Sequence, residues 1–114
     1  MKILMTLYKL AFWGLLTAVA YLSLISLPQT QHVILWQDRF LHAAIYGALC
    51  FLMLRAYGDR WGIWPLAIGL GLFGLVIEVV QSTTGYRQAE IWDLIANLVG
   101  IFTVGLAVQY FRIR

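Results

Sequence analysis

Long apolar segments alternate with short polar ones along the chain. The first apolar segment, residues 10–27, has 18 residues without a charge. As a helix it would be about 27 Å long, close to the thickness of a bilayer core. Three further apolar segments are long enough to span a membrane. The pattern predicts an all-α, polytopic membrane protein with four transmembrane helices, at about residues 10–27, 39–55, 62–81 and 91–111.

Residues that start or stop helices mark the expected helix ends. Pro28 ends the first helix, whereas Pro65 lies in the first turn of the third, where proline is tolerated. Residues 1–9 form a short amphipathic lead, and polar connections are expected at residues 29–37, 58–60 and 82–88.

A cleavable signal peptide is the competing interpretation of the first segment, because residues 18–20 (Ala-Val-Ala) resemble a cleavage site. The apolar run continues to Leu27, which is longer than the apolar region of a usual signal peptide. We therefore expect this segment to remain as a membrane span.

The amino-acid composition indicates what surrounds the helices. The 114 residues are 62% hydrophobic and 11% charged, whereas a soluble domain carries about 25% charged residues. Most of the surface must therefore face lipid. The length allows one domain, residues 1–114. A single cysteine, Cys50, excludes an internal disulfide and a metal site built from several cysteines.

The basic residues divide unequally between the two sides of the membrane. With four spans, both termini and the second connection share a side that carries six of the eight Lys and Arg residues. The positive-inside rule places this side, and both termini, in the cytoplasm. Because these residues sit at helix ends, the net charge of +3 favours contact with anionic membrane lipids over nucleic acid. The six are Lys2, Lys9, Arg55, Arg60, Arg112 and Arg114.

Polar side chains share a face on two of the expected helices. At about 100° per residue, Asp38, His42 and Tyr46 lie within about 80° of one another on the second helix. On the fourth helix, Asp93 and Asn97 lie within about 60° of one another. Both helices start on the outer side, so we expect these residues in the outer part of the membrane.

The third helix carries a stripe of small residues that ends in an acid: Ala67, Gly71, Gly74 and Glu78. Small residues line interfaces where membrane helices approach closely, so Glu78 is expected to face the bundle. His42, Glu78 and Asn97 each lie about one turn, or about 6 Å, below their helix ends. Three helices are thus expected to bring polar groups to one outer layer. The candidate ligand-binding residues are Asp38, His42, Tyr46, Glu78, Gln81, Arg87, Asp93 and Asn97.

Most of these residues also have a structural explanation. Asp38 and Asp93 stand where an acid caps a helix or complements its dipole. His42 and Asn97 are suited to hydrogen bonds between helices. Neither explanation favours an acid near a helix C-terminus, so Glu78 is the strongest functional candidate. The other structural alternatives are Tyr46 as core, Glu90 as a dipole partner, Arg87 as an exposed loop charge and Cys50 as packing.

The order of these residues resembles the VanZ-like family of small bacterial membrane proteins. That family's pattern has an acid, His and Tyr at four-residue steps, then Glu-x-x-Gln, an Arg, and Asp-x-x-x-Asn-x-x-Gly. The resemblance covers about residues 38–105. The family often has a second glycine four residues after the last of these, where this chain has Val104, and a proline before the Arg, where it has Gly85 and Tyr86. The matching residues are Asp38, His42, Tyr46, Glu78, Gln81, Arg87, Asp93, Asn97 and Gly100.

The resemblance implies a protein of the bacterial cytoplasmic membrane and, for the family's namesake, low-level resistance to the glycopeptide teicoplanin. We interpret the site first as an outward-facing binding or modulating site for a lipid headgroup, an envelope precursor or a glycopeptide drug. We also expect Arg87 to fold back over Glu78 and Asp93 and to present donors to an anionic ligand.

An intramembrane enzyme acting on an envelope lipid is the main alternative, either with His42 and one of Glu78 and Asp93 as an acid/base pair or with the help of a metal held by the histidine and the carboxylates. No Ser or Cys stands at a spacing that supports covalent catalysis, and no ligand spacing supports a metal, so we expect no metal or cofactor. Ion or proton coupling lacks charged groups between the outer layer and the inner surface. A structural role in an envelope assembly also stays open, and the sequence sets no oligomeric state.

Overall fold

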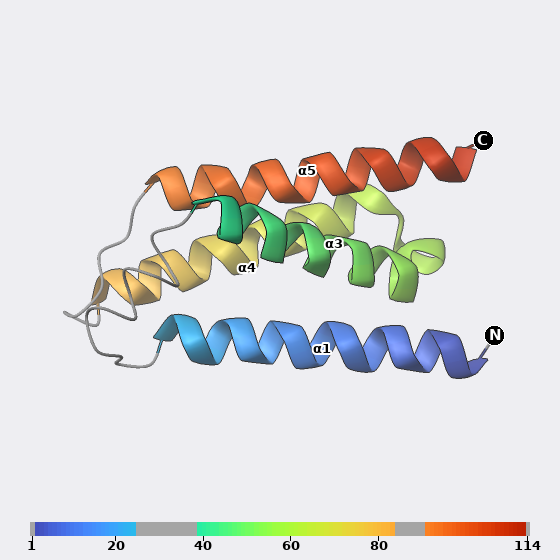
Figure 1. Cartoon of the computed structure of the whole chain (residues 1–114), viewed down its shortest axis with the longest axis horizontal. Coiled ribbons are helices and arrows are strands. Elements are labelled where there is room, and N and C mark those ends of the chain that lie inside the picture. Colours follow the sequence, from blue (N-terminus) through green and yellow to red (C-terminus); the bar gives the residue numbers. More distant parts are fainter. Residues whose placement is uncertain (1, 25–38, 84–90, 114) are drawn as a thin grey trace.

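The structure is a computed structural model that describes residues 2–24, 39–83 and 91–113, and the secondary structure in these ranges is helical. The elements are α1 (Lys2–Leu24), α3 (Arg39–Trp61), α4 (Ile63–Thr83) and α5 (Ile91–Ile113) (Figure 1). Each of these helices contains at least 18 consecutive residues apolar enough to cross a membrane. The predicted all-α fold with four membrane-spanning helices is therefore confirmed, and the chain is a multi-pass membrane protein.

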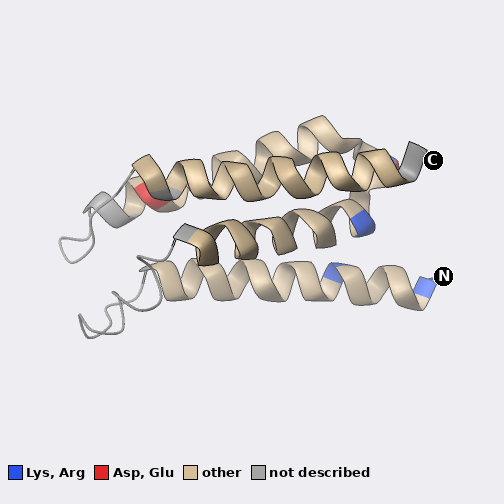
Figure 2. Ribbon diagram, turned by 45° about the horizontal axis from the view of Figure 1, so that its top comes forward, with Lys and Arg blue, Asp and Glu red and all other residues tan. Residues whose placement is uncertain are grey.

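Consecutive helices run antiparallel in an elongated bundle of 45 × 26 × 21 Å. Both termini and the turn between α3 and α4 lie at one end of this bundle (Figure 1). We call it the basic end, because the ribbon segments that Figure 2 colours for Lys and Arg lie toward it. The opposite, distal end is where α1 and α4 stop and where α3 and α5 begin.

The turn predicted at residues 58–60 is wrong, because α3 continues through these residues to Trp61. Gly62 ends the helix instead. Its φ of 79° is left-handed, which glycine adopts without strain, and its N–H donates to the Gly58 carbonyl oxygen at 3.0 Å. Since α4 begins at Ile63, one residue joins the two helices.

The predicted start of the first helix is also wrong, because α1 begins at Lys2 and not at residue 10. The residues expected as a separate lead are mostly good helix formers, such as Leu, Met and Lys, and none of them breaks a helix. The predicted end at residue 27 lies outside the described residues.

The helices α3 and α5 form the most extensive helix pair. Leu49, Cys50 and Ile101 are fully buried in the core, and Cys50 Sγ donates to the Ile101 carbonyl oxygen at 3.4 Å. This position supports the packing explanation for the single cysteine.

Two glycines let α3 and α5 approach closely. A Cβ on Gly100 would overlap the Ala43 carbonyl oxygen and lie 2.8 Å from the carbonyl carbon, so the two backbones touch there. A Cβ on Gly47 would lie 2.9 Å from Val104 Cγ2. Val104 therefore fills the room that Gly47 leaves one turn away, and a second glycine on α5 is not required for close packing at this level.

Large apolar side chains cover the outer faces of the bundle. Continuous apolar surface of this kind is unfavourable in water and suited to lipid. Examples with more than half of the side chain exposed are Ile68, Leu72, Val76 and Val79 on α4 and Val99 and Leu106 on α5.

Candidate functional site

Polar side chains are buried at one level of the bundle. Among the described residues, Ser23, His42, Glu78 and Asn97 are buried polar or charged groups, each at most 6% exposed. Ser23 and Glu78 lie near the ends of α1 and α4, and His42 and Asn97 near the starts of α3 and α5. All of these positions belong to the distal half of the bundle.

His42 and Asn97 join α3 to α5 by a buried hydrogen bond, with 3.2 Å between His42 Nδ1 and Asn97 Oδ1. Because a carbonyl oxygen accepts, the proton lies on Nδ1, and in the neutral imidazole the lone pair is then on Nε2. The bond fixes the orientation of the ring. A histidine held in this way presents Nε2 in a defined direction, as a general base requires.

Gly74 on α4 makes room for Asn97 and for Tyr46. A Cβ on Gly74 would lie 3.3 Å from Tyr46 Cε2, 3.4 Å from Asn97 Nδ2 and 3.6 Å from the Tyr46 hydroxyl oxygen. The tyrosine ring and the amide therefore both rest against the α4 backbone. Tyr46 itself is only 3% exposed.

Glu78 follows Gly74 by one turn on the same face of α4 and is buried. This face of α4 meets Tyr46 and Asn97 at Gly74, so the carboxylate lies one turn along the helix from these polar groups. Further along the stripe, Ala67 is buried and Gly71 packs against Leu98 of α5. The stripe is thus a helix interface. We refer to His42, Tyr46, Glu78 and Asn97 as the polar cluster.

The remaining candidates are placed incompletely or not at all. Gln81 and Asp93 lie in α4 and α5, but their side chains are outside the described part of the structure. Asp38 and Arg87 lie outside the described residues altogether. The expected contact of Arg87 with Glu78 and Asp93 therefore stays a prediction.

Sequence reasoning missed Ser23, the buried polar residue of α1. It belongs to a buried stripe with Phe12 and Val19, at spacings of seven and four. This helical spacing, on an otherwise apolar span, could have been used to predict that Ser23 is buried.

The fold and the polar cluster define a multi-pass α-helical membrane protein with a buried polar layer at one end. No three His, Cys, Asp or Glu side chains within the described ranges come together as a metal-binding group. No family model, curated protein or solved structure matches this chain.

Proposed function

We propose that the chain is a VanZ-like protein of the bacterial cytoplasmic membrane, and that its polar cluster binds the polar part of an envelope ligand from the outer leaflet. The ligand class comprises a lipid headgroup, an envelope precursor or a glycopeptide such as teicoplanin. The proposal is supported mainly by the burial of an imidazole, a carboxylate and an amide, each from a different helix. Such groups are costly within a membrane and mark functional sites.

The outward orientation is supported by charge. Lys2, Lys9, Arg55 and Arg60 lie in the half of the bundle opposite the polar cluster. Cytoplasmic segments carry the excess of Lys and Arg. With the basic end in the cytoplasm, the polar cluster lies in the outer half of the membrane.

Cysteine labelling of intact cells tests this orientation. In a Cys50→Ala background, Thr83→Cys is expected to react with a membrane-impermeant maleimide, and Asp59→Cys is expected to react only after permeabilisation. Both positions are exposed, at opposite ends of the bundle. The reverse labelling pattern would contradict the proposed orientation.

Ligand-dependent melting tests the binding role. Teicoplanin, a short-chain phospholipid and a short-chain lipid-linked envelope precursor are added separately to the protein in detergent. At a hundredfold excess over Kd, a ligand specific for the folded protein stabilises it by about 2.7 kcal/mol. We expect at least one to raise the melting temperature of the parent protein but not of His42→Ala or Glu78→Gln.

Thr103→Ala is the matched control, because Thr103 is an exposed polar residue on α5 outside the polar cluster. It should retain the full ligand response. If the two cluster variants respond like the parent protein, the polar cluster is not the binding site. A folded protein that responds to none of the three ligand classes would contradict the proposed ligand class.

The orienting bond from Asn97 favours a second candidate, an intramembrane enzyme in which His42 is the base and Glu78 the acid. Conversion of a bound lipid-linked precursor would then be lost in His42→Ala while the melting response to the ligand persists. Product analysis by mass spectrometry separates this function from binding alone.

A further inference from the structure

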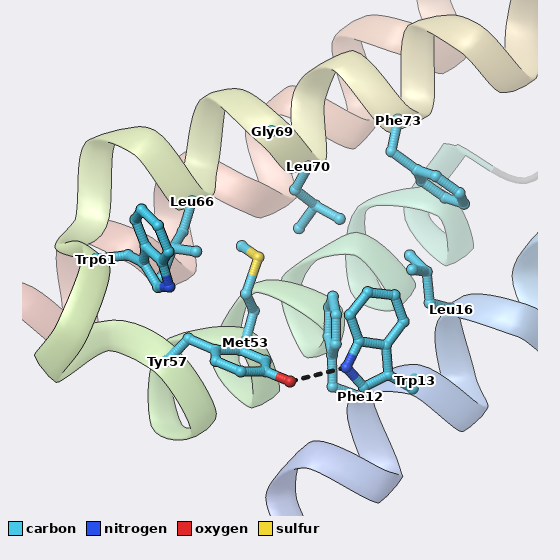
Figure 3. Close-up of a pocket in the computed structure, with 10 residues that line it drawn as sticks. All are labelled: Phe12, Trp13, Leu16, Met53, Tyr57, Trp61, Leu66, Gly69, Leu70 and Phe73. Carbon is cyan, nitrogen blue, oxygen red and sulfur yellow. Dashed lines mark hydrogen bonds between the residues drawn. The ribbon is translucent and has the colours of Figure 1, made fainter.

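A cavity lies between α1 and α4, on the side of the polar cluster that faces the basic end. Its volume is about 390 Å³, within the range of small-molecule sites. α1, α3 and α4 all contribute side chains to it, and Figure 3 shows these converging on the space. The lining residues are Phe12, Trp13, Leu16, Met53, Tyr57, Trp61, Leu66, Gly69, Leu70 and Phe73.

The lining of this inner groove is apolar. Two of its three polar side-chain groups pair with each other, since Trp13 Nε1 donates to the Tyr57 hydroxyl oxygen at 2.9 Å, and the third is the indole N–H of Trp61 (Figure 3). Gly69 keeps the α4 side open, because no atom lies within 4 Å of a Cβ built there. From Leu66 to Phe73 the α4 wall extends about 10 Å along the helix axis. The groove therefore suits a hydrocarbon chain better than a polar molecule.

Basic side chains stand at the inner end of the groove. Lys9 Nζ lies 5.4 Å from the centre of the Tyr57 ring, and the Arg60 guanidinium lies 5.8 Å from that of Trp61. Lys9 also precedes Trp13 by one turn on the same face of α1. Both cations thus contact aromatic rings that line the groove.

The other described charges in this part of α3, Arg55 and Asp59, lie on a different face. Arg55 stacks over Tyr8 at 5.3 Å, and Tyr8 does not line the groove. Asp59 follows Arg55 by four residues and therefore shares its face of α3. Since Arg55 is about 200° around the helix from both Met53 and Tyr57, this face points away from the groove. The groove rim is consequently positive.

We propose that the inner groove binds an anionic phospholipid of the cytoplasmic leaflet, with an acyl chain along α4 and the phosphate between Lys9 and Arg60. Basic pockets between membrane helices on the cytoplasmic side hold anionic headgroups, and the apolar lining supplies the matching chain site. The choice of leaflet rests on the orientation proposed above, whereas lipid binding in the groove does not, so ligand binding at either site can fail without the other.

Tryptophan quenching tests the proposal directly, because Trp13 and Trp61 line the groove. A full-length variant that keeps only these two, with Trp36, Trp64 and Trp92 changed to Phe, is reconstituted in phosphatidylcholine vesicles. Brominated-chain phosphatidylglycerol or brominated-chain phosphatidylcholine is added at equal mole fraction. We expect the anionic lipid to bind the groove more tightly, with each of Lys9→Gln and Arg60→Gln lowering this preference about fivefold.

Arg55→Gln is the matched control, with the same loss of charge on the other face of α3, and should keep the preference. Gly69→Leu fills the groove and should reduce quenching by both lipids, whereas Gly14→Leu, also with no atom within 4 Å of its Cβ, should not. Equal quenching by both lipids, or equal losses in Arg55→Gln and Lys9→Gln, would overturn the proposal. Absence of quenching by either lipid would show that protein, from a second copy or another helix, covers the groove.

Discussion

Gly100→Ala is expected to lower the free energy of unfolding by about 1–3 kcal/mol or more, the usual effect of overpacking. The added Cβ would overlap the Ala43 carbonyl oxygen and lie 2.8 Å from its carbon. These are backbone atoms of α3, so no side chain can rotate away and the two helices must separate. Separation weakens the packing around Leu49 and Ile101. Reversible unfolding in mixed micelles, followed by helical circular dichroism, measures the loss.

Two other glycines provide the comparison. Gly14→Ala meets no atom within 4 Å and should change stability by less than about 0.5 kcal/mol. Gly47→Ala meets the Val104 side chain, so its effect should be smaller than that of Gly100→Ala and should be relieved by Val104→Ala. If Gly100→Ala is as harmless as Gly14→Ala, α3 and α5 do not touch at Gly100 in the membrane.

Asn97→Leu is expected to destabilise the protein by about 1–3 kcal/mol, because it removes a hydrogen-bond partner from a buried histidine. Replacing both partners by apolar groups is much less unfavourable than removing one. The double variant His42→Phe with Asn97→Leu should therefore recover much of the lost stability. The same unfolding measurement gives the coupling energy between the two residues.

The ligand response distinguishes structure from function in this double variant. Recovered stability without any ligand-dependent rise in melting temperature would show that the His42–Asn97 pair serves binding as well as packing. Additive effects of the two substitutions on stability would contradict the buried hydrogen bond. Thr103→Val, at an exposed position of α5, controls for the loss of a polar group from the helix.

The spans were predictable because a long apolar segment in a membrane has few alternatives to a helix. The end of α3 was not predictable in this way. Gly58, Asp59 and Arg60 look like a turn, yet the buried Gly58 continues the helix, and it is Gly62 that has the left-handed backbone. Sequence spacing does not show which of two nearby glycines takes that conformation, because the choice depends on packing across the hairpin.

For the site, helical spacing correctly placed Glu78 and the small residues before it on an interface. The spacing did not identify the residues of the other helices that these α4 residues contact. The contact of Gly100 with Ala43 and the packing of Tyr46 against Gly74 depend on the relative rotation and height of the helices. The inner groove could likewise not be predicted from residue spacing within a single helix, because three helices form its walls.

The tight connection at Gly62 and the backbone contact at Gly100 also determine how the protein responds to bilayer thickness. Gly62 prevents α3 and α4 from sliding past each other, and the Gly100–Ala43 contact fixes α5 against α3. These three helices must tilt as one block when the hydrocarbon layer becomes thinner or thicker. α1 belongs to the same block, because it contacts α3 more extensively than α4 does and its Phe12 and Val19 lie in the buried core. The walls of the inner groove therefore tilt together with the rest of the bundle.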